Sequence, residues 1–264
     1  MNTATTKSDT HFKKDALVIG LVGIAHGISH FFHMILAPLF PWLKEAFSLS
    51  YAELGLLMSV FFVISGIGQA LAGFVVDKLG ARPVLFFGII CLGVSALVLA
   101  AAPNYTFLLI GSMLAGLGNS VFHPSDFTIL NKSVSTKRLS HAFSVHGISG
   151  NLGWAAAPVF LVSMANFWSW RIALLGAAVL PLIVLLILFM YRHVLHTEVV
   201  HQTYSSDKSP TENIENSAFH FMSLPAVWMC FAFFFMISMG LGGIQSFSAT
   251  ALREIYGMSL GWAT

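Results

Sequence analysis

The chain has 264 residues, of which 56% are hydrophobic and only 9% charged, and its formal net charge is +2. A soluble domain carries about a quarter charged residues, so this composition excludes an ordinary soluble protein and indicates an integral membrane protein. The basic residues are spread through the connections, and we expect no nucleic-acid partner. Cys91 and Cys230 lie in apolar runs and match neither a disulfide framework nor a zinc motif.

Seven apolar runs are long enough to cross a bilayer, which takes about 20 residues. Because a spanning segment must satisfy its own backbone hydrogen bonds, each run is predicted to be a helix. The predicted spans are residues 16–43, 54–76, 83–102, 105–130, 141–165, 171–191 and 221–249. The predicted fold class is therefore all-α integral membrane, preceded by a polar tail over residues 1–15.

The Lys and Arg residues divide unevenly between the two ends of these spans. Ten of the 13 lie on the side of the N-terminal tail, and three, Lys44, Arg171 and Arg253, lie on the other. Connections rich in Lys and Arg stay in the cytoplasm, so the N-terminus is predicted to be cytoplasmic. The protein itself is predicted to lie in the cell (inner) membrane. The polar segment 192–220 lies on the same side and is predicted to be a flexible cytoplasmic linker.

Three histidines, His26, His30 and His33, lie in the first predicted span. At about 100° per residue they fall within an arc of about 60° and share one face. An imidazole is cheaper to bury than a fixed charge, and it titrates near neutral pH. The stripe either bonds neighbouring helices, or faces a cavity where it binds substrate or relays protons, or contributes to a metal site. No Cys or carboxylate in this span completes a metal ligand set, so no metal site is assigned.

A compact charged segment connects the second and third predicted spans. It has the pattern G-x-x-x-D-[RK]-x-G-x-R, formed by Gly73, Asp77, Lys78, Gly80 and Arg82. Gly80 is expected to take φ > 0 in so tight a turn. The pattern resembles the signature loop between the second and third helices of major facilitator superfamily transporters, and an ordinary charged turn is the alternative.

The fourth predicted span carries Asn119, His123, Pro124 and Asp126. Pro124 removes a backbone donor and is predicted to kink the helix. His123 and Asp126 are three residues apart and share a face. They are expected either to form a structural hydrogen bond with each other or to serve in coupling or substrate binding. Asp126 is the one carboxylate well inside a predicted span.

Small residues mark the fifth predicted span. Gly147, Gly150 and Gly153 are predicted to let a neighbouring helix approach closely. His146 and Asn151 of the same span are expected to face a central cavity.

Two motifs in these spans sharpen the resemblance. Gly-Asn-Ser-Val-Phe-His-Pro at 118–124 and Gly-Asn-Leu-Gly-(x4)-Pro at 150–158, ending on Pro158, resemble the fosmidomycin-resistance branch of the superfamily. The resemblance implies that two six-helix halves rock about a central site and are driven by a proton gradient. Ser125 departs from that branch, which tends to carry an acid there, and Ala157 stands where antiporters usually have Gly.

An internal repeat agrees with a two-half plan. Residues 43–50 follow the first span, and the similar residues 252–259 follow the seventh at an offset of 209. Parallel six-helix repeats are the plan of the major facilitator fold. We therefore expect an N-terminal six-helix half at 16–191 and the start of a second half at 221–264, stopping at the threshold of an eighth helix.

The predicted function is secondary active transport of a small organic solute by alternating access, with proton-coupled efflux as the form that the resemblance implies. An uptake permease of the same superfamily and a seven-helix receptor or sensor are the alternatives. The expected partners are the lipid bilayer, a small-molecule substrate and protons, with no enzyme activity and no cofactor.

Asp77 is expected to meet a helix N-terminus of the second half and hold an inner gate shut. The predicted substrate or proton pathway comprises His26, His30, His33, Asn119, His123, Asp126, His146 and Asn151.

Overall fold

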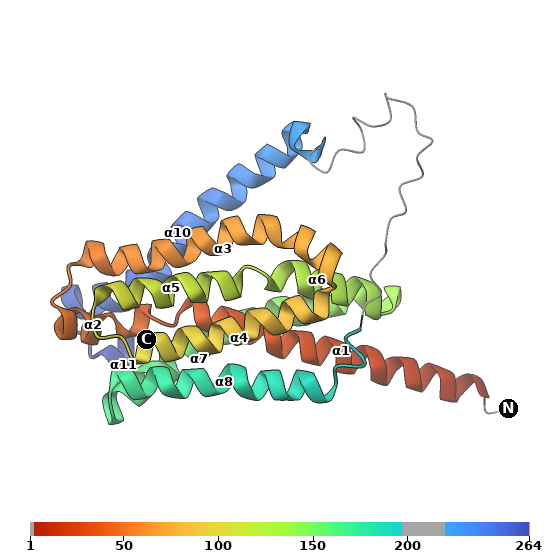
Figure 1. Ribbon diagram of the computed structural model, residues 1–264, viewed down its shortest axis with the longest axis horizontal. Helices are drawn as coiled ribbons and strands as arrows, with labels where there is room; N and C mark the ends of the chain where they lie inside the picture. Colours follow the sequence, from red (N-terminus) through yellow and green to blue (C-terminus); the bar gives the residue numbers. More distant parts are fainter. Residues whose placement is uncertain (1–2, 197–219, 264) are drawn as a thin grey trace.

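A computed structural model describes residues 3–196 and 220–263, and its regular elements there are helices (Figure 1). The α-helices are α1 (Thr3–His33), α2 (Phe40–Phe47), α3 (Tyr51–Leu79), α4 (Ala81–Ala100), α5 (Tyr105–Asn119), α6 (Phe122–Ser133), α7 (Leu139–Phe167), α8 (Trp170–Met190), α10 (Pro225–Tyr256) and α11 (Leu260–Ala263). The 3-10 helices are η1 (Ala37–Leu39), η2 (Thr136–Arg138) and η3 (His220–Ser223). The predicted all-α class is confirmed. Most of the predicted linker lies outside the described residues.

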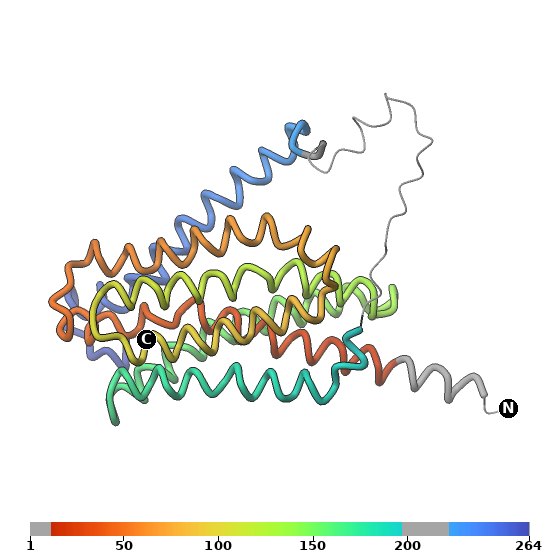
Figure 2. Tube along the Cα trace, viewed as in Figure 1, coloured from red at the N-terminus to blue at the C-terminus, as the bar shows by residue number. Residues whose placement is uncertain are grey.

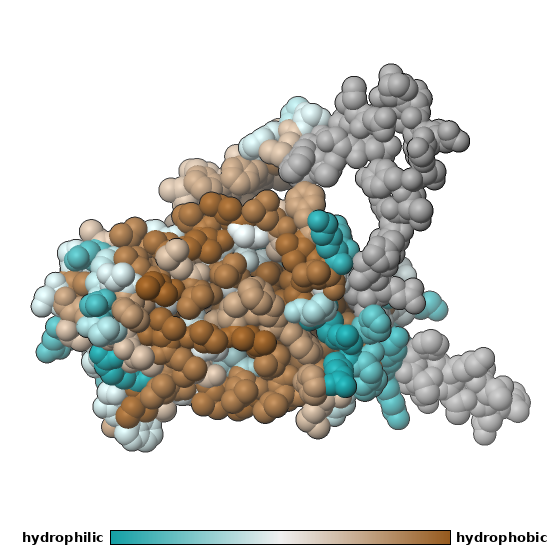
Figure 3. All heavy atoms as spheres, viewed as in Figure 1, coloured by the Kyte–Doolittle hydropathy of each residue, from teal (hydrophilic) through white to brown (hydrophobic). Residues whose placement is uncertain are grey.

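Seven segments of the described chain are long and apolar enough to cross a membrane, which confirms the predicted number. Apolar side chains form a broad band around the middle of the visible surface, and hydrophilic side chains gather at its two ends (Figure 3). This distribution is that of a multi-pass membrane protein whose polar ends face water on either side of the bilayer.

The first predicted span is not one continuous helix, which corrects the prediction. Helix α1 begins at Thr3, within the predicted tail, and ends at His33. The amides of Met34 and Ile35 bond three residues back, to Phe31 and Phe32, so the last turn tightens. Pro38 has no amide to donate, and the chain restarts as η1 and then α2.

The fourth span is also broken, close to the predicted kink. Helix α5 ends at Asn119 and α6 begins at Phe122, so the break precedes Pro124. Pro124 then lies in the first turn of α6, where a missing amide removes no intrahelical hydrogen bond. The break changes the packing of this span, since α5 packs mainly on α3 and α4 whereas α6 packs on α1 as extensively as on α4.

The helices run side by side along the long axis of the molecule (Figure 2). Helix α1 packs on α7, and α4 packs between α5 and α8. Helix α10 contacts this bundle towards its C-terminal end, where the ring centroid of Phe247 lies 5.6 Å from that of Phe40 with the two rings tilted. Only Ser246 and Thr250 of α10 are buried.

The connection between the second and third spans is shorter than the predicted span ends implied. Gly80 alone separates α3 from α4, and its φ of 85° confirms the expected positive value. Asp77 and Lys78 form the exposed last turn of α3. Arg82, in the first turn of α4, donates to the carbonyl oxygen of Arg192 at 3.2 Å, which ties this turn to the segment after α8.

A buried carboxylate joins α1 to the start of α7. Asp15 was placed in the polar tail, but its exposed fraction is only 3%. Its Oδ2 accepts hydrogen bonds from the guanidinium of Arg138 at 2.8 Å and from the hydroxyl of Ser135 at 2.5 Å. The fold therefore fastens the beginning of the first span to the connection that precedes the fifth.

The two repeat segments end their helices in the same way. Ser48 follows α2 with φ 54°, and its equivalent Gly257 follows α10 with φ 64°. Their amides donate to the carbonyl oxygens of Lys44 and Arg253, which are also equivalent positions in the repeat. A left-handed residue of this kind is a common way to end an α-helix. The sequence similarity is thus accompanied by the same local backbone geometry.

Candidate functional site

Six titratable side chains from three helices meet inside the bundle. We call them the histidine cluster, defined as His26, His30, His33, His123, Asp126 and His146. The ring centroid of His26 lies 4.3 Å from that of His30, 5.2 Å from that of His123 and 3.4 Å from that of His146, on which it stacks. The three-helix meeting depends on the break in the fourth span, because α6 contacts α1 there.

Four of the six cluster side chains are buried, and His33 and His123 are half-buried. Asp126 is fully buried, and the exposed fractions of His26, His146 and His30 are 2%, 6% and 9%. Buried polar groups normally have hydrogen-bond partners, so a group without one needs an explanation. Within the cluster, partners among the described residues are lacking at His26 Nε2, at both ring nitrogens of His30, at His33 Nε2 and at Asp126 Oδ1.

The partner of Asp126 is not His123. Its Oδ2 accepts from His146 Nε2 at 3.1 Å, so the carboxylate joins α6 to α7. His123 lies on the same side of α6, but its Nδ1 bonds to Oε1 of Gln69 on α3, at 2.9 Å. The hydrogen bond between His123 and Asp126 that the spacing allowed is therefore absent, because each side chain forms a hydrogen bond with a different neighbouring helix.

The tautomer of His26 follows from its backbone partner. Its Nδ1 lies 2.7 Å from the carbonyl oxygen of His146, which can only accept. Nδ1 therefore carries the proton, and Nε2 presents a lone pair towards the cluster. His33 is held in the opposite state, since Trp154 Nε1 donates to its Nδ1 at 3.2 Å.

Asn119 and Asn151 are placed very differently. Asn119 accepts from the hydroxyl of Ser65 at 2.6 Å and donates to the carbonyl oxygen of Ser29 at 3.3 Å. It thereby links the end of α5 to α3 and α1, next to the break in the fourth span. Asn151 lies on an exposed face of α7, outside the histidine cluster.

The three predicted packing glycines of α7 differ in the space around them. A Cβ on Gly150 would lie 2.8 Å from His26 Cε1 and from His30 Nδ1, and one on Gly153 would overlap the carbonyl oxygen of Gly27. Gly147 faces open space. The close approach of α1 and α7 therefore uses Gly150 and Gly153, and no described helix approaches Gly147. Pro158 lies inside α7 without ending it.

The structure adds two residues that the sequence analysis did not select. Gln69 fixes His123, and Trp154 both donates to His33 and lies 4.5 Å from the His30 ring. Gln69 is the one carboxamide side chain in α3, a polar residue within an apolar run. That signal was present in the sequence, whereas nothing in the sequence distinguished Trp154 from an apolar core residue.

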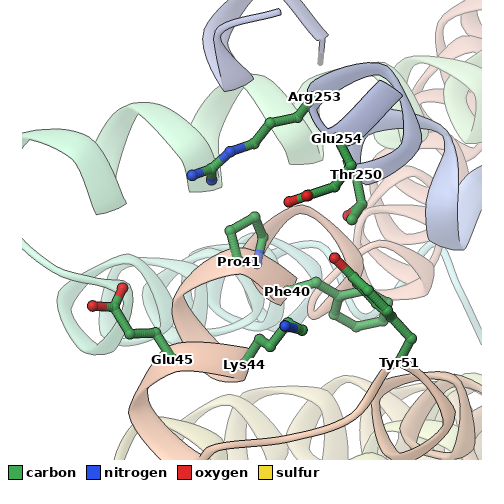
Figure 4. A pocket seen from close by; sticks show the side chains of 8 residues that line it. All are labelled: Phe40, Pro41, Lys44, Glu45, Tyr51, Thr250, Arg253 and Glu254. Atoms are coloured by element: carbon green, nitrogen blue, oxygen red, sulfur yellow. The ribbon is translucent and has the colours of Figure 1, made fainter. Parts of the chain in front are cut away.

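A surface pocket, separate from the histidine cluster, lies between the two repeat segments. Its volume is about 320 Å³, and Figure 4 shows its lining. The lining residues are Phe40, Pro41, Lys44, Glu45, Tyr51, Thr250, Arg253 and Glu254. It offers solvated charges of both signs, and none of these residues belongs to the histidine cluster. The cluster, with its buried unpartnered groups, is the better candidate site.

Comparisons with known proteins agree with the sequence motifs. The family described as Major Facilitator Superfamily matches residues 22–264. The chain is 29% identical to the fosmidomycin resistance protein of Escherichia coli (strain K12) over 185 residues, which is 69% of this chain and 44% of that protein. It is 28% identical over 154 residues to an uncharacterized MFS-type transporter, YfnC, of Bacillus subtilis (strain 168), covering 57% of this chain and 37% of that one.

Among solved structures, a bacterial homologue of the human lysosomal transporter Spinster, in an inward-facing and unoccupied conformation, is similar with a TM-score of 0.69. The sequences are 18% identical, and the match covers 95% of this chain and 58% of that one. This likeness confirms the major facilitator fold. The chain spans about half the length of the relatives that it matches.

Proposed function

Since the chain belongs to the Major Facilitator Superfamily, we propose that it serves secondary active transport of a small organic solute by alternating access. The observation that carries this proposal is the buried histidine cluster, which places unpartnered polar groups inside a membrane bundle. Ionisable side chains at membrane depth are costly and generally mark a substrate or ion pathway.

The chemistry of the cluster favours a neutral or weakly ionised solute. Asp126 is its one carboxylate, and that group is already bonded to His146. The imidazoles of His26 and His30 offer hydrogen-bonding nitrogens without fixed charge. The indole of Trp154, beside His30, adds an aromatic surface on which a planar solute can stack.

Efflux is the direction that we propose, because the name of the Escherichia coli relative refers to drug resistance. Proton coupling is part of the proposal and is supported by the pair of Asp126 and His146, which can hold or release a proton between two helices. We also propose that the N-terminus is cytoplasmic, since ten of the 13 Lys and Arg residues lie in connections on its side.

The test is an accumulation assay with a panel of labelled, weakly ionised organic compounds. Cells expressing the protein from its own gene are compared with cells that lack it, with membrane abundance measured in both. Lower accumulation of a compound in the expressing cells supports efflux, and higher accumulation indicates an uptake permease instead. If accumulation of every compound is unchanged while the protein is present in the membrane, the efflux proposal is rejected.

Proton coupling is tested with the first compound that moves. Collapse of the pH gradient by a protonophore is expected to abolish net movement. Asp126→Asn is expected to abolish gradient-driven movement while leaving exchange of labelled for unlabelled compound across the membrane. Gradient-driven movement that survives both treatments would remove protons from the mechanism.

A further inference from the structure

Ring nitrogens of three cluster histidines lie close to one another. His26, His30 and His123 each offer one ring nitrogen, and these three atoms lie within 4.8 Å of one another. His26, Asp126 and His146 form a second set under the same limit, so His26 belongs to both. The first span alone lacked a complete ligand set, and the fold supplies the missing ligands from α6 and α7.

We propose that this cluster binds a divalent transition-metal ion of the zinc type, with His26, His30 and His123 as ligands. Imidazole nitrogen suits zinc, copper and nickel, and three protein ligands leave a position open for water or an exchangeable ligand. The proposal concerns metal binding by the folded protein and does not depend on transport.

The hydrogen bonds around the cluster leave the ligand atoms in the required state. His26 donates from Nδ1 to the carbonyl oxygen of His146, and His123 Nδ1 bonds to the side-chain oxygen of Gln69. In both rings Nδ1 carries the proton, and Nε2 keeps a lone pair for a metal. Metal-binding histidines commonly donate their other nitrogen in this way, which fixes the tautomer and the ring orientation.

Burial gives a second, independent argument. His26 Nε2 and both nitrogens of His30 are buried without a hydrogen-bond partner in the described residues. A lone pair buried in this way is unfavourable unless something binds it. A metal ion bound by His26 Nε2 and by one nitrogen of His30 would give both of these atoms a partner.

The charge of the ion also has a partner nearby. A divalent cation inside a membrane protein needs compensating negative charge. Asp126 is fully buried, its Oδ1 has no hydrogen-bond partner among the described residues, and it shares a ligand set with His26. The carboxylate thus lies where it can compensate the positive charge of the ion, either directly or through His146.

The geometry requires little rearrangement. Ligand nitrogens on one tetrahedral zinc ion lie about 3.4 Å apart, because each bond is about 2.1 Å long. The three nitrogens lie within 4.8 Å of one another, so ring movements of at most about 1.4 Å close the set. His33 belongs to neither set, and its Nδ1 accepts from Trp154.

The test is zinc binding by the protein purified in detergent and stripped with a chelator. Isothermal titration with Zn²⁺ is expected to show one site per chain, and Co²⁺ in its place is expected to give visible d–d absorption bands typical of nitrogen ligands. His26→Ala and His123→Ala are expected to abolish both signals. Gln69→Ala, which removes only the orienting partner of His123, is expected to weaken zinc about 10- to 100-fold.

His141→Ala is the matched control. It removes an exposed histidine from α7, the helix that carries His146, and is expected to leave zinc affinity unchanged. The elution profile in size-exclusion chromatography confirms that each variant is folded, and Gln69→Ala keeps the test valid if a ligand variant is not. Absence of stoichiometric binding to the wild-type protein would overturn the proposal. Equal binding by wild type, His26→Ala and His123→Ala would also overturn it, since the ion would then lie elsewhere.

Discussion

Asp126 of α6 accepts a hydrogen bond from His146 of α7 across 3.1 Å, and neither side chain is more than slightly exposed. This contact joins the second half of the broken fourth span to the fifth span. The carbonyl group of the same His146 also accepts from His26 of α1 at 2.7 Å. One residue of α7 therefore links the carboxylate to the histidine stripe of the first span.

The Asp126 contact predicts a difference between two substitutions. Asp126→Ala removes the acceptor and leaves a buried imidazole N–H of His146 unsatisfied, so the free energy of unfolding is expected to fall by about 1–3 kcal/mol. Asp126→Asn keeps an oxygen acceptor in place and is expected to cost less. Thermal unfolding in detergent measures both. Equal losses of stability would show that the amide oxygen does not replace the carboxylate, and unchanged stability in Asp126→Ala would show that the hydrogen bond contributes nothing.

The glycines of α7 provide a second pair of predictions. Gly153→Ala places a Cβ against the backbone carbonyl of Gly27, which cannot rotate away, and is expected to cost about 1–3 kcal/mol by overpacking. Gly147→Ala enters open space and is expected to be neutral or to stabilise the helix by up to about 1 kcal/mol. Thermal unfolding of the two variants side by side is the measurement. Similar effects at both positions would contradict the close approach of α1 and α7 at Gly153.

The ion pair between Asp15 of α1 and the partly exposed Arg138 gives a third prediction. Asp15→Ala leaves Arg138 and Ser135 without their shared acceptor and is expected to lower the free energy of unfolding by about 1–3 kcal/mol. Lys14→Ala, at the exposed neighbouring position, is the control and is expected to change stability little. Denaturation in detergent compares the two, and an unaffected Asp15→Ala protein would mean that solvent replaces the contact.

The sequence predicted the spans well because hydrophobicity and length determine what can cross a bilayer. It also predicted the shared face of His26, His30 and His33, since helical periodicity fixes which residues of one helix are neighbours. It did not predict that Asp126 bonds to His146, because that choice depends on how three helices pack. Trp154 was missed for the same reason, whereas Gln69 was detectable as the one carboxamide in the apolar helix α3, although its partner was not.

Asp77 allows a test of the proposed gate. It lies in the exposed last turn of α3, where no described contact requires its charge for folding. Asp77→Asn is therefore expected to lower transport while leaving membrane insertion and abundance intact, because a carboxylate is favoured at a helix N-terminus that it would meet in the closed gate. Transport rate and abundance are measured together. Unchanged transport would remove the gate role, and reduced abundance would point to a role in folding instead.

The repeat predicts opposite effects at two equivalent positions. Ser48 and Gly257 both have positive φ at the end of a helix, but only glycine adopts that conformation without a steric penalty. Ser48→Gly is expected to relieve the penalty, partly offset by the greater freedom of glycine in the unfolded chain, and to stabilise the protein by up to about 1 kcal/mol. Gly257→Ser introduces the same penalty and is expected to destabilise by a similar amount. Thermal unfolding of both variants and of the double variant is the measurement, and the double variant is expected to be close to wild type. A destabilising Ser48→Gly would mean that the serine hydroxyl contributes more than its backbone strain costs, and that the two repeat ends are alike in shape but not in energy.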